Sequence, residues 1–250
     1  MREKQIEKAD LLEIIYYTDP LCCWSWGFEP QWRRLLYEFS GRMKYRYCMG
    51  GLLPEWKNYH DTVNSVTRPI QMGPVWMHAK EISGMPIDQN IWMRDPPSSS
   101  YPCCIAVKCA ALQSAEAEEK YLRLLREALM IEGINISRQQ ALLGVAKNLA
   151  DAFNEFDLDR FKDDLNNDNG LEAFRKDLQE AQYLHISRFP TLVIKNENKN
   201  GMVISGYRSY TLLMNEIQQI TNFKFAEKIG LEKYKEFWPA LIERELQEII

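Results

Sequence analysis

The sequence predicts an α/β protein in which a long helical segment interrupts a sheet domain. An apolar run at residues 11–17 is typical of a buried strand, and helical apolar spacing follows it closely. A second apolar strand follows Pro190 and turns back as a hairpin. Between these regions, residues 61–183 have mostly helical periodicity. We therefore expect a sheet domain built from both ends of the chain, with the helical segment inserted between its halves.

Cys22 stands where the first strand gives way to a helix. Asp19 and Pro20 end the strand, and the apolar spacing from Trp26 to Phe39 predicts a helix behind it. Free N–H groups and the dipole at a helix N-terminus stabilise a thiolate and lower a thiol pKa from about 8.5. A reactive thiolate is the working hypothesis for Cys22. The alternative is an inert buried cysteine, a common role for a free thiol.

Pro190 heads the later strand, in the run Phe189-Pro190-Thr191. Proline cannot donate to a sheet ladder, so it belongs at a strand start or an edge, and a cis peptide bond is a common reason to place one there. The strand at 192–194 and a second at 202–204 predict a hairpin with a flexible polar tip.

The inserted segment opens with an unusual concentration of Met, Trp and Pro, at residues 67–77 and 84–97. Filling an irregular core is the simplest role for these side chains. The alternative is an apolar cleft wall facing Cys22, in which Arg68 and Arg94 would meet a carboxylate.

Helical patterns fill the rest of the insertion and the end of the chain. Three serines before Tyr101-Pro102 predict a helix start, and the small apolar residues around Cys104 and Cys109 predict tight core packing. The Glu- and Lys-rich tail has an apolar stripe, which we expect to dock on the body, and dimerisation through the tail stays open. Helices are expected at residues 116–130, 138–153, 157–184 and 211–220 and in the tail, residues 223–250.

The order of strand, cysteine-led helix, long interval and Phe-Pro-Thr strand resembles the thioredoxin fold in its DsbA-like form. Runs at 45–52, 98–111 and 205–207 are also similar to cytoplasmic DsbA-family proteins, which include FrnE-like oxidoreductases and YjbH-type ClpXP adaptors. The resemblance implies an α/β thioredoxin fold with a large inserted α-helical domain and a C-terminal helical extension. The implied parts are a thioredoxin-like domain at 11–60 and 184–222, the inserted domain at 61–183, and the extension at 223–250.

The same resemblance implies a substrate surface. It predicts a cis bond at Phe189-Pro190, which would place the Phe189 backbone beside Cys22. In this family that backbone pairs with an extended peptide or thiol substrate. Phe189, Pro190, Thr191 and Trp24 are therefore the expected substrate-binding residues, and Cys22 and Ser25 the expected catalytic ones.

One position departs from the redox members of the family, which carry Cys-x-x-Cys. This chain has Cys22-Cys23-Trp24-Ser25, so a serine stands where the resolving thiol would attack a mixed disulfide. The Ser25 hydroxyl can instead donate a hydrogen bond that favours the Cys22 thiolate. Cys23 is a poor resolver because adjacent side chains diverge, and we expect it to pack in the core. The mechanism that remains is monothiol: Cys22 forms a mixed disulfide with the substrate, and an external thiol such as glutathione releases it.

Three functions stay open on this sequence. The first is a DsbA-family thiol-disulfide oxidoreductase that works through Cys22 alone. Asp19 is then either a helix-entry residue, the role we favour, or a local tuner whose negative charge opposes formation of the Cys22 thiolate. The second is a glutathione-dependent transferase or isomerase of the kappa-class type, a reading weakened because those proteins have serine at the position of Cys22. The third is a non-enzymatic YjbH-like protease adaptor that holds a client protein.

Composition limits the partners. A net charge of -4 does not favour binding to nucleic acid, which requires a basic surface. The sequence has no uninterrupted apolar stretch long enough to span a membrane. The highly charged start does not read as a signal peptide, so we expect a cytoplasmic protein with its six cysteines mostly reduced. His60, His78 and His185 have no metal-binding spacing. We expect no metal and no tightly bound cofactor, with glutathione only as a co-substrate.

Overall fold

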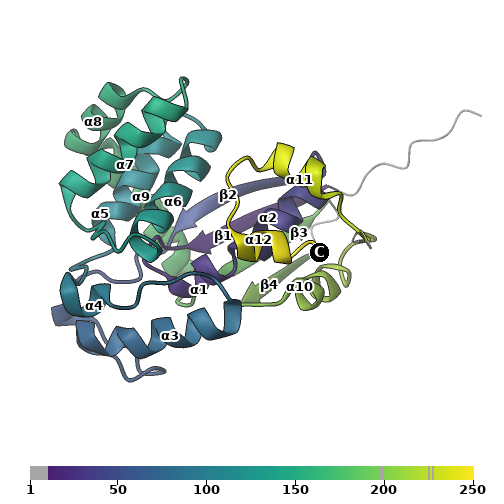
Figure 1. Cartoon of the computed structure of the whole chain (residues 1–250), viewed down its shortest axis with the longest axis horizontal. Coiled ribbons are helices and arrows are strands. Elements are labelled where there is room, and N and C mark those ends of the chain that lie inside the picture. The colour runs from purple at the N-terminus through teal and green to yellow at the C-terminus, as the bar shows by residue number, and fades with distance from the viewer. Residues whose placement is uncertain (1–10, 198–199, 225, 227) are drawn as a thin grey trace, which may run out of the picture.

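The computed structural model describes residues 11–197, 200–224, 226 and 228–250. The charged first ten residues, and Asn198 and Lys199 in the predicted flexible hairpin tip, lie outside the described residues. The described chain forms a sheet beside a helical lobe, and the C-terminal tail lies next to both (Figure 1). The predicted α/β fold is therefore confirmed.

In the part that the structure describes, one four-stranded sheet has the order β2-β1-β3-β4. β1 and β2 run parallel because helices connect them, whereas β3 is antiparallel to both β1 and β4. The predicted hairpin is the β3–β4 pair. The strands are β1 (Leu12–Thr18), β2 (Met43–Met49), β3 (Thr191–Asn196) and β4 (Gly201–Ser205).

Helices make up most of the remaining described chain. Short 3₁₀ helices at Trp56–Asn58 and Pro69–Gln71 precede the helical lobe. The α-helices are α1 (Cys23–Gly27), α2 (Glu29–Glu38), α3 (Met72–Ser83), α4 (Ile91–Arg94), α5 (Tyr101–Ala111), α6 (Ala115–Met130), α7 (Gln139–Ala152), α8 (Leu158–Asn166), α9 (Asn169–Tyr183), α10 (Tyr210–Ile217), α11 (Leu231–Phe237) and α12 (Glu243–Gln247).

Two expected helices are each broken in two. The helix expected from Trp26 to Phe39 divides at Phe28 into α1 and α2, because Pro30 lacks an N–H and stands in the first turn of α2. The segment expected to be helical from 157 to 184 divides into α8 and α9, where Asp168 takes a left-handed conformation with φ 65°.

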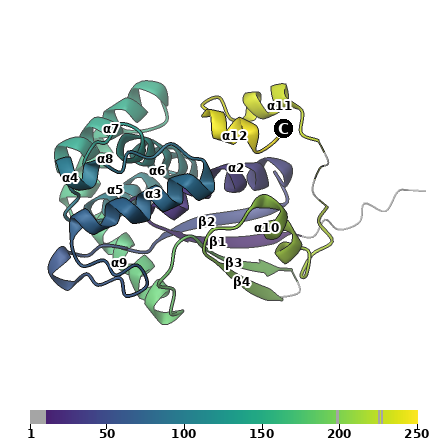
Figure 2. The same cartoon turned by 60° about the horizontal axis from the view of Figure 1, so that its bottom comes forward.

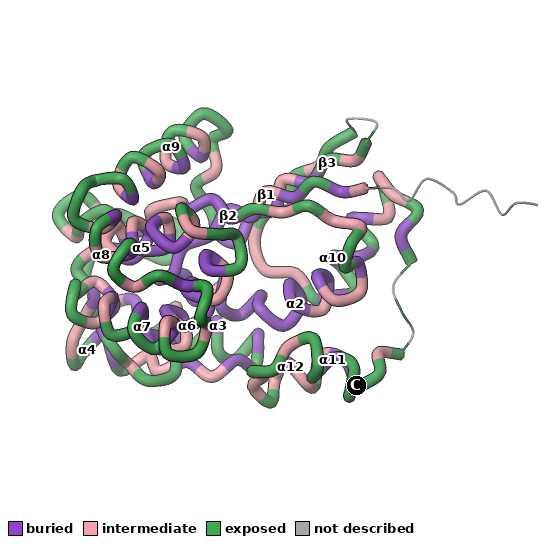
Figure 3. The backbone as a smooth tube through the Cα atoms, turned by 90° about the horizontal axis from the view of Figure 1, so that it is seen from above, coloured by how far each residue is buried: buried purple, intermediate pink, exposed green. Residues whose placement is uncertain are grey.

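The two faces of β1 pack against different layers. Successive strand residues point to opposite sides, so Tyr16 and Tyr17 enter different apolar clusters. Tyr16 meets Trp32 of α2 edge to face, with 4.9 Å between ring centroids. Tyr17 packs in the cluster that contains Ala181 of α9. Buried backbone runs through β1 and α2 at the centre of the molecule (Figure 3).

The Met- and Trp-rich start of the insertion is mostly core. Trp76 and Trp92 are fully buried and meet edge to face, with 5.1 Å between ring centroids. Arg94 forms an ion pair with Asp88 rather than facing Cys22. Core packing is thus confirmed for the two tryptophans, as it is for Cys104 and Cys109, which are both buried.

The tail docks on α2, as its apolar stripe predicts. Helices α11 and α12 lie on the side of α2 that faces away from the sheet (Figure 2). Trp238 and Ile242 of the tail pack against the main core. Polar contacts add to this packing: Arg33 donates to the Ala240 carbonyl and Arg34 to the Glu248 carbonyl, both at 2.7 Å. Ile249 is buried beside them.

Candidate functional site

Cys22 is the N-cap residue of α1, the position that the sequence predicts for it. Its extended backbone turns the chain from β1 into the helix, and its Sγ accepts a hydrogen bond from the Ser25 N–H at 3.4 Å. Only 5% of Cys22 is exposed. Cys23 points into the main core instead, which confirms that the two adjacent side chains diverge.

The start of β3 lies directly against the thiol. The Phe189-Pro190 peptide bond is cis, and the Cys22 Sγ donates to the Phe189 carbonyl at 3.5 Å. The expectation that the Phe189 backbone lies beside Cys22 is therefore confirmed. Gly50 makes this approach feasible, because a Cβ there would stand 1.8 Å from the Phe189 ring.

The remaining predicted residues surround this contact. Pro190 and Thr191 are buried, and the Thr191 hydroxyl donates to the Arg188 carbonyl at 2.7 Å. The half-buried Trp24 packs against the cluster that contains Cys22. Its ring lies between His78 of α3, at 5.4 Å, and Tyr207, at 6.0 Å between centroids. Of the six predicted site residues, Trp24 alone is more than marginally exposed, so the site is closed.

Electrostatics at Cys22 run opposite to the expectation of an acidic thiol. Burial raises the pKa of the Cys22 thiol above its ordinary value, and the nearby Asp19 charge raises it further. The Ser25 side chain and N–H favour the thiolate but do not outweigh burial. The dipole of α1 does not compensate for burial, because this helix is only five residues long and its first turn is covered by protein.

Ser25 contacts the Cys22 thiol through its main chain. Its backbone N–H donates to the Cys22 Sγ at 3.4 Å. The buried hydroxyl oxygen makes no hydrogen bond of normal geometry among the described residues, but the Ser25 side chain is close enough to favour the Cys22 thiolate. The role of the hydroxyl as a partner of the thiolate therefore stays a prediction.

Asp19 does not cap the helix but joins three segments. One carboxylate oxygen accepts from the Leu21 N–H at 2.8 Å, and the other accepts from the Leu52 N–H at 2.6 Å. Cys104 of α5 donates to the second oxygen at 3.4 Å. Burial raises the pKa of Asp19, while these bonds oppose the rise. Asp19 therefore fixes the loop before Cys22 to the chain after β2 and to the inserted helices.

Sequence reasoning missed several residues near the site. Gly50 belongs to a Gly-Gly pair, a usable signal for close approach of another chain segment. Cys48 packs in the same apolar cluster as Cys22, with its Sγ donating to the Asp177 carbonyl at 3.5 Å. Arg126 of α6 donates to the Thr18 hydroxyl and to Glu29. No local sequence pattern predicts that this arginine is buried.

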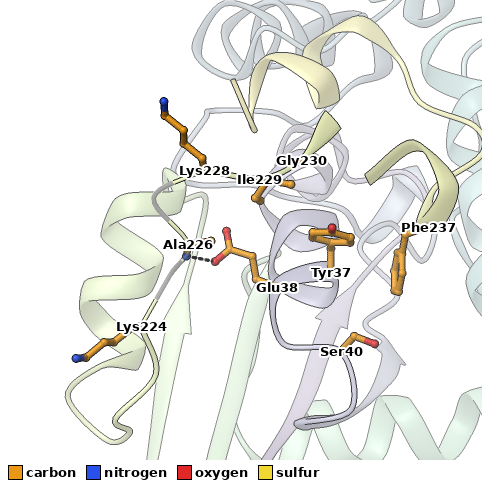
Figure 4. A pocket seen from close by; sticks show the side chains of 9 residues that line it. All are labelled: Tyr37, Glu38, Ser40, Lys224, Ala226, Lys228, Ile229, Gly230 and Phe237. Atoms are coloured by element: carbon orange, nitrogen blue, oxygen red, sulfur yellow. Dashed lines mark hydrogen bonds between the residues drawn. The ribbon is translucent and has the colours of Figure 1, made fainter. Parts of the chain in front are cut away.

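An open groove lies elsewhere, between α2 and the segment that leads to α11 (Figure 4). Tyr37, Glu38, Lys224 and Phe237 help to line it, and Glu38 accepts from the Ala226 N–H at 2.8 Å. None of the predicted site residues lines this groove. Among the described residues, no cluster of three or more His, Cys, Asp or Glu side chains could hold a metal ion. None of the described helices has the length and apolar character needed to cross a membrane.

This fold, with a cap cysteine against a cis-proline strand, defines a thioredoxin-type protein. A thioredoxin family model matches residues 16–215, and the chain belongs to that family. It is similar to the ClpXP adapter protein SpxH of Halalkalibacterium halodurans, with 29% identity over 224 residues that span 89% of this chain and 72% of the relative. The SpxH of Shouchella clausii is 30% identical over 214 residues, 85% of this chain and 68% of that protein.

Among solved structures, the fold is similar to a putative protein disulfide isomerase from Nitrosomonas europaea. The TM-score is 0.67 at 21% sequence identity, over 84% of this chain and 98% of that one. At this identity the likeness concerns the fold alone. The expected DsbA-like fold and the YjbH-like branch are both supported by these comparisons.

Proposed function

We propose that this chain is a ClpXP adaptor that uses a thioredoxin scaffold to hold a client protein for proteolysis. The observation that carries the proposal is the closed state of Cys22. Cys22 is 5% exposed, and its thiol donates to the Phe189 carbonyl and has a raised pKa. Ser25 occupies the position of a resolving cysteine. A protein that only binds a client needs neither an exposed acidic thiol nor a resolving cysteine.

The similarity to ClpXP adapter proteins supports the same function. A protein that binds a client keeps the shape of its scaffold and has no need for dithiol chemistry. This function agrees with the cytoplasmic location that the composition predicts.

The test is complementation in Bacillus subtilis lacking its own SpxH, a relative of this chain. Protein half-lives are measured by pulse-labelling proteomics in cells with the wild-type chain, with Cys22→Ser, or with an empty vector. We expect a set of proteins to regain rapid, ClpXP-dependent turnover with both versions of the chain. Turnover equal to that of the empty vector would contradict the adaptor function.

A second candidate is thiol exchange by Cys22 alone, as the sequence predicts. The observation in its favour is the contact of the thiol with the Ser25 N–H and the Phe189 carbonyl at the end of β1. In this reaction the Cys22 thiolate would attack one sulfur of a disulfide. The disulfide bond breaks, the second sulfur leaves as a thiolate, and Cys22 keeps a mixed disulfide.

Incubation with glutathione disulfide at pH 8, followed by peptide mass spectrometry, tests this candidate. Thiol exchange predicts a glutathione adduct on Cys22 that reduced glutathione removes. In Ser25→Cys, it predicts that a disulfide between Cys22 and the introduced thiol replaces the adduct. An unmodified Cys22 in both proteins, while an unstructured cysteine peptide reacts, would exclude this function.

A further inference from the structure

A buried charge cluster connects the C-terminal tail to the helix that Cys22 caps. It contains as many arginines as glutamates, and all of its members except the partly exposed Glu127 are almost fully buried. We call it the arginine cluster; its members are Arg33, Arg123, Arg126, Glu29, Glu127 and Glu245.

Glu245 of α12 is the contribution of the tail to this cluster. It is 0% exposed, and both of its carboxylate oxygens accept from Arg123, at 2.6 and 3.1 Å. Arg33 of α2 approaches the same carboxylate at 3.4 Å. The Arg33 guanidinium also stacks on Trp238 of the tail, 4.6 Å from the ring centroid. The tail therefore supplies a buried counter-ion that α2 and α6 do not replace.

The other end of the cluster reaches the segment that contains Cys22. The Arg123 guanidinium lies 4.7 Å from the ring centroid of Trp26, a fully buried residue of α1. The backbone N–H of Trp26 in turn donates to the Cys22 carbonyl at 3.0 Å. One helical turn further along α6, Arg126 donates to the hydroxyl of Thr18, the last residue of β1. Two arginines of the cluster thus contact the chain on either side of Cys22.

Glu29 couples the two arginines. It pairs with Arg126 at 2.8 Å and lies 3.6 Å from Arg123 and 3.4 Å from Arg33. If the tail leaves, three buried arginines share only Glu29 and Glu127. Buried charges that lose a partner are strongly unfavourable, so water must enter or the arginines must move. Either response loosens the contacts with Trp26 and Thr18.

The docking of the tail suits reversible release. Its two helices are seven and five residues long, too short to be stable alone. The contacts of α12 include polar ones, among them Arg244 donating to the Ser83 carbonyl at 2.8 Å. An open groove separates α12 from the end of α3, with Lys80, Met85 and Glu243 in its walls. Solvent therefore already reaches one side of the contact.

We propose that the C-terminal extension is a conformational switch of the Cys22 site: while Glu245 completes the arginine cluster the site stays closed, and release of the tail opens it. The proposal goes beyond the adaptor function, and its readouts need neither a client nor a protease.

The test measures two quantities on the native full-length protein. The first is the rate of Cys22 alkylation by iodoacetamide, followed by peptide mass spectrometry. The second is amide hydrogen exchange in residues 18–28 and in 238–248. Glu245→Gln removes the buried charge at nearly constant shape, and Glu243→Gln is the matched control, since Glu243 is exposed on the same helix. Arg244→Gln loosens the tail through the Ser83 contact, without changing the arginine cluster.

We expect Glu245→Gln to increase tail exchange and to raise the Cys22 alkylation rate at least tenfold, with faster exchange in residues 18–28. Arg244→Gln should raise the Cys22 rate in proportion to its effect on the tail, and Glu243→Gln should match the wild type. Faster tail exchange with a Cys22 rate within twofold of the wild type, in either variant, would overturn the proposal. So would unchanged tail exchange in Glu245→Gln. If Glu245→Gln does not fold, Arg244→Gln decides alone.

Discussion

At the scale of single residues, burial of Cys22, rather than its place at a helix start, determines how readily its thiol ionises. The thiol donates a hydrogen bond to the Phe189 carbonyl, and protein surrounds it. Desolvation disfavours the thiolate, and the Ser25 side chain with the N–H groups of Ser25 and Trp24 only partly offsets this cost. A thiol in this environment stays protonated near neutral pH.

The pH dependence of Cys22 alkylation follows from that environment. Because burial raises its pKa, the thiolate fraction should still be increasing at about pH 9, beyond the value of about 8.5 for an ordinary thiol. Alkylation rates between pH 6 and 10, measured by peptide mass spectrometry against a free cysteine peptide, check this. A Cys22 rate that levels off below about pH 7.5 would show an activated thiolate instead.

Gly50 gives a second prediction at this scale. A methyl group there would overlap the Phe189 ring, so Gly50→Ala should displace that ring and reduce the free energy of unfolding by about 1–3 kcal/mol. Gly73→Ala is the control, because a Cβ at this helical position meets nothing within 4 Å and should leave stability equal or improved. Urea unfolding curves compare both variants, and equal stability of Gly50→Ala and the wild type would contradict the observed packing.

At the scale of elements, α2 joins the sheet to the tail. Its inner face carries Trp32, which packs on β1, and its other side presents Arg33 and Arg34 to the tail. Glu29 stands in its first turn, among three arginines. Burial opposes ionisation of Glu29, but Arg126, Arg123 and Arg33 outweigh it and hold the pKa of this carboxyl below its ordinary value.

Glu29→Gln should therefore reduce the free energy of unfolding at pH 7 by about 3 kcal/mol or more, because Arg126 loses its buried counter-ion. The stabilisation by Glu29 is present above its unfolded-state pKa of about 4.3 and is lost as pH falls through the lower folded-state pKa. The wild type and the variant should thus converge in urea unfolding experiments at acid pH. A difference that grows as the pH falls would show that the arginines do not control this carboxyl.

At the scale of the whole molecule, the sheet domain and the inserted helices share one core. The main apolar cluster includes Leu12 of β1, Leu125 of α6 and Ile204 of β4 without a break. Asp19 also links these parts, because its carboxylate accepts hydrogen bonds from the Leu52 N–H and the Cys104 thiol. The insertion is therefore packed into the fold rather than appended to it.

This shared core predicts cooperative unfolding. Tryptophan fluorescence, which reports both Trp32 beside the sheet and Trp76 in the insertion, should change with the same urea midpoint as far-ultraviolet circular dichroism. Hydrogen exchange in α7 and β1 should give similar opening free energies. Separate transitions for the helical lobe and the sheet would contradict a single core.

Much of this architecture could be predicted from local patterns, because strands, helices and the Phe189-Pro190 junction have local signatures. The resemblance to a known family then placed Phe189 beside Cys22 across the chain. The features that could not be predicted depend on burial and on contacts between distant segments. They are the raised pKa of Cys22, the hydrogen bonds of Asp19, and the pairing of Arg123 with Glu245. Charged residues in amphipathic helices are usually solvated, so nothing in the sequence distinguished the buried arginines.

The most direct test of the adaptor function is a reconstituted degradation assay. Purified ClpXP is mixed with a client identified by the half-life experiment, with no adaptor, with the wild-type chain or with Cys22→Ser. We predict that both versions of the chain accelerate degradation of the client to the same extent. No acceleration by the wild type, or acceleration that disappears in Cys22→Ser, would contradict an adaptor that works without its thiol.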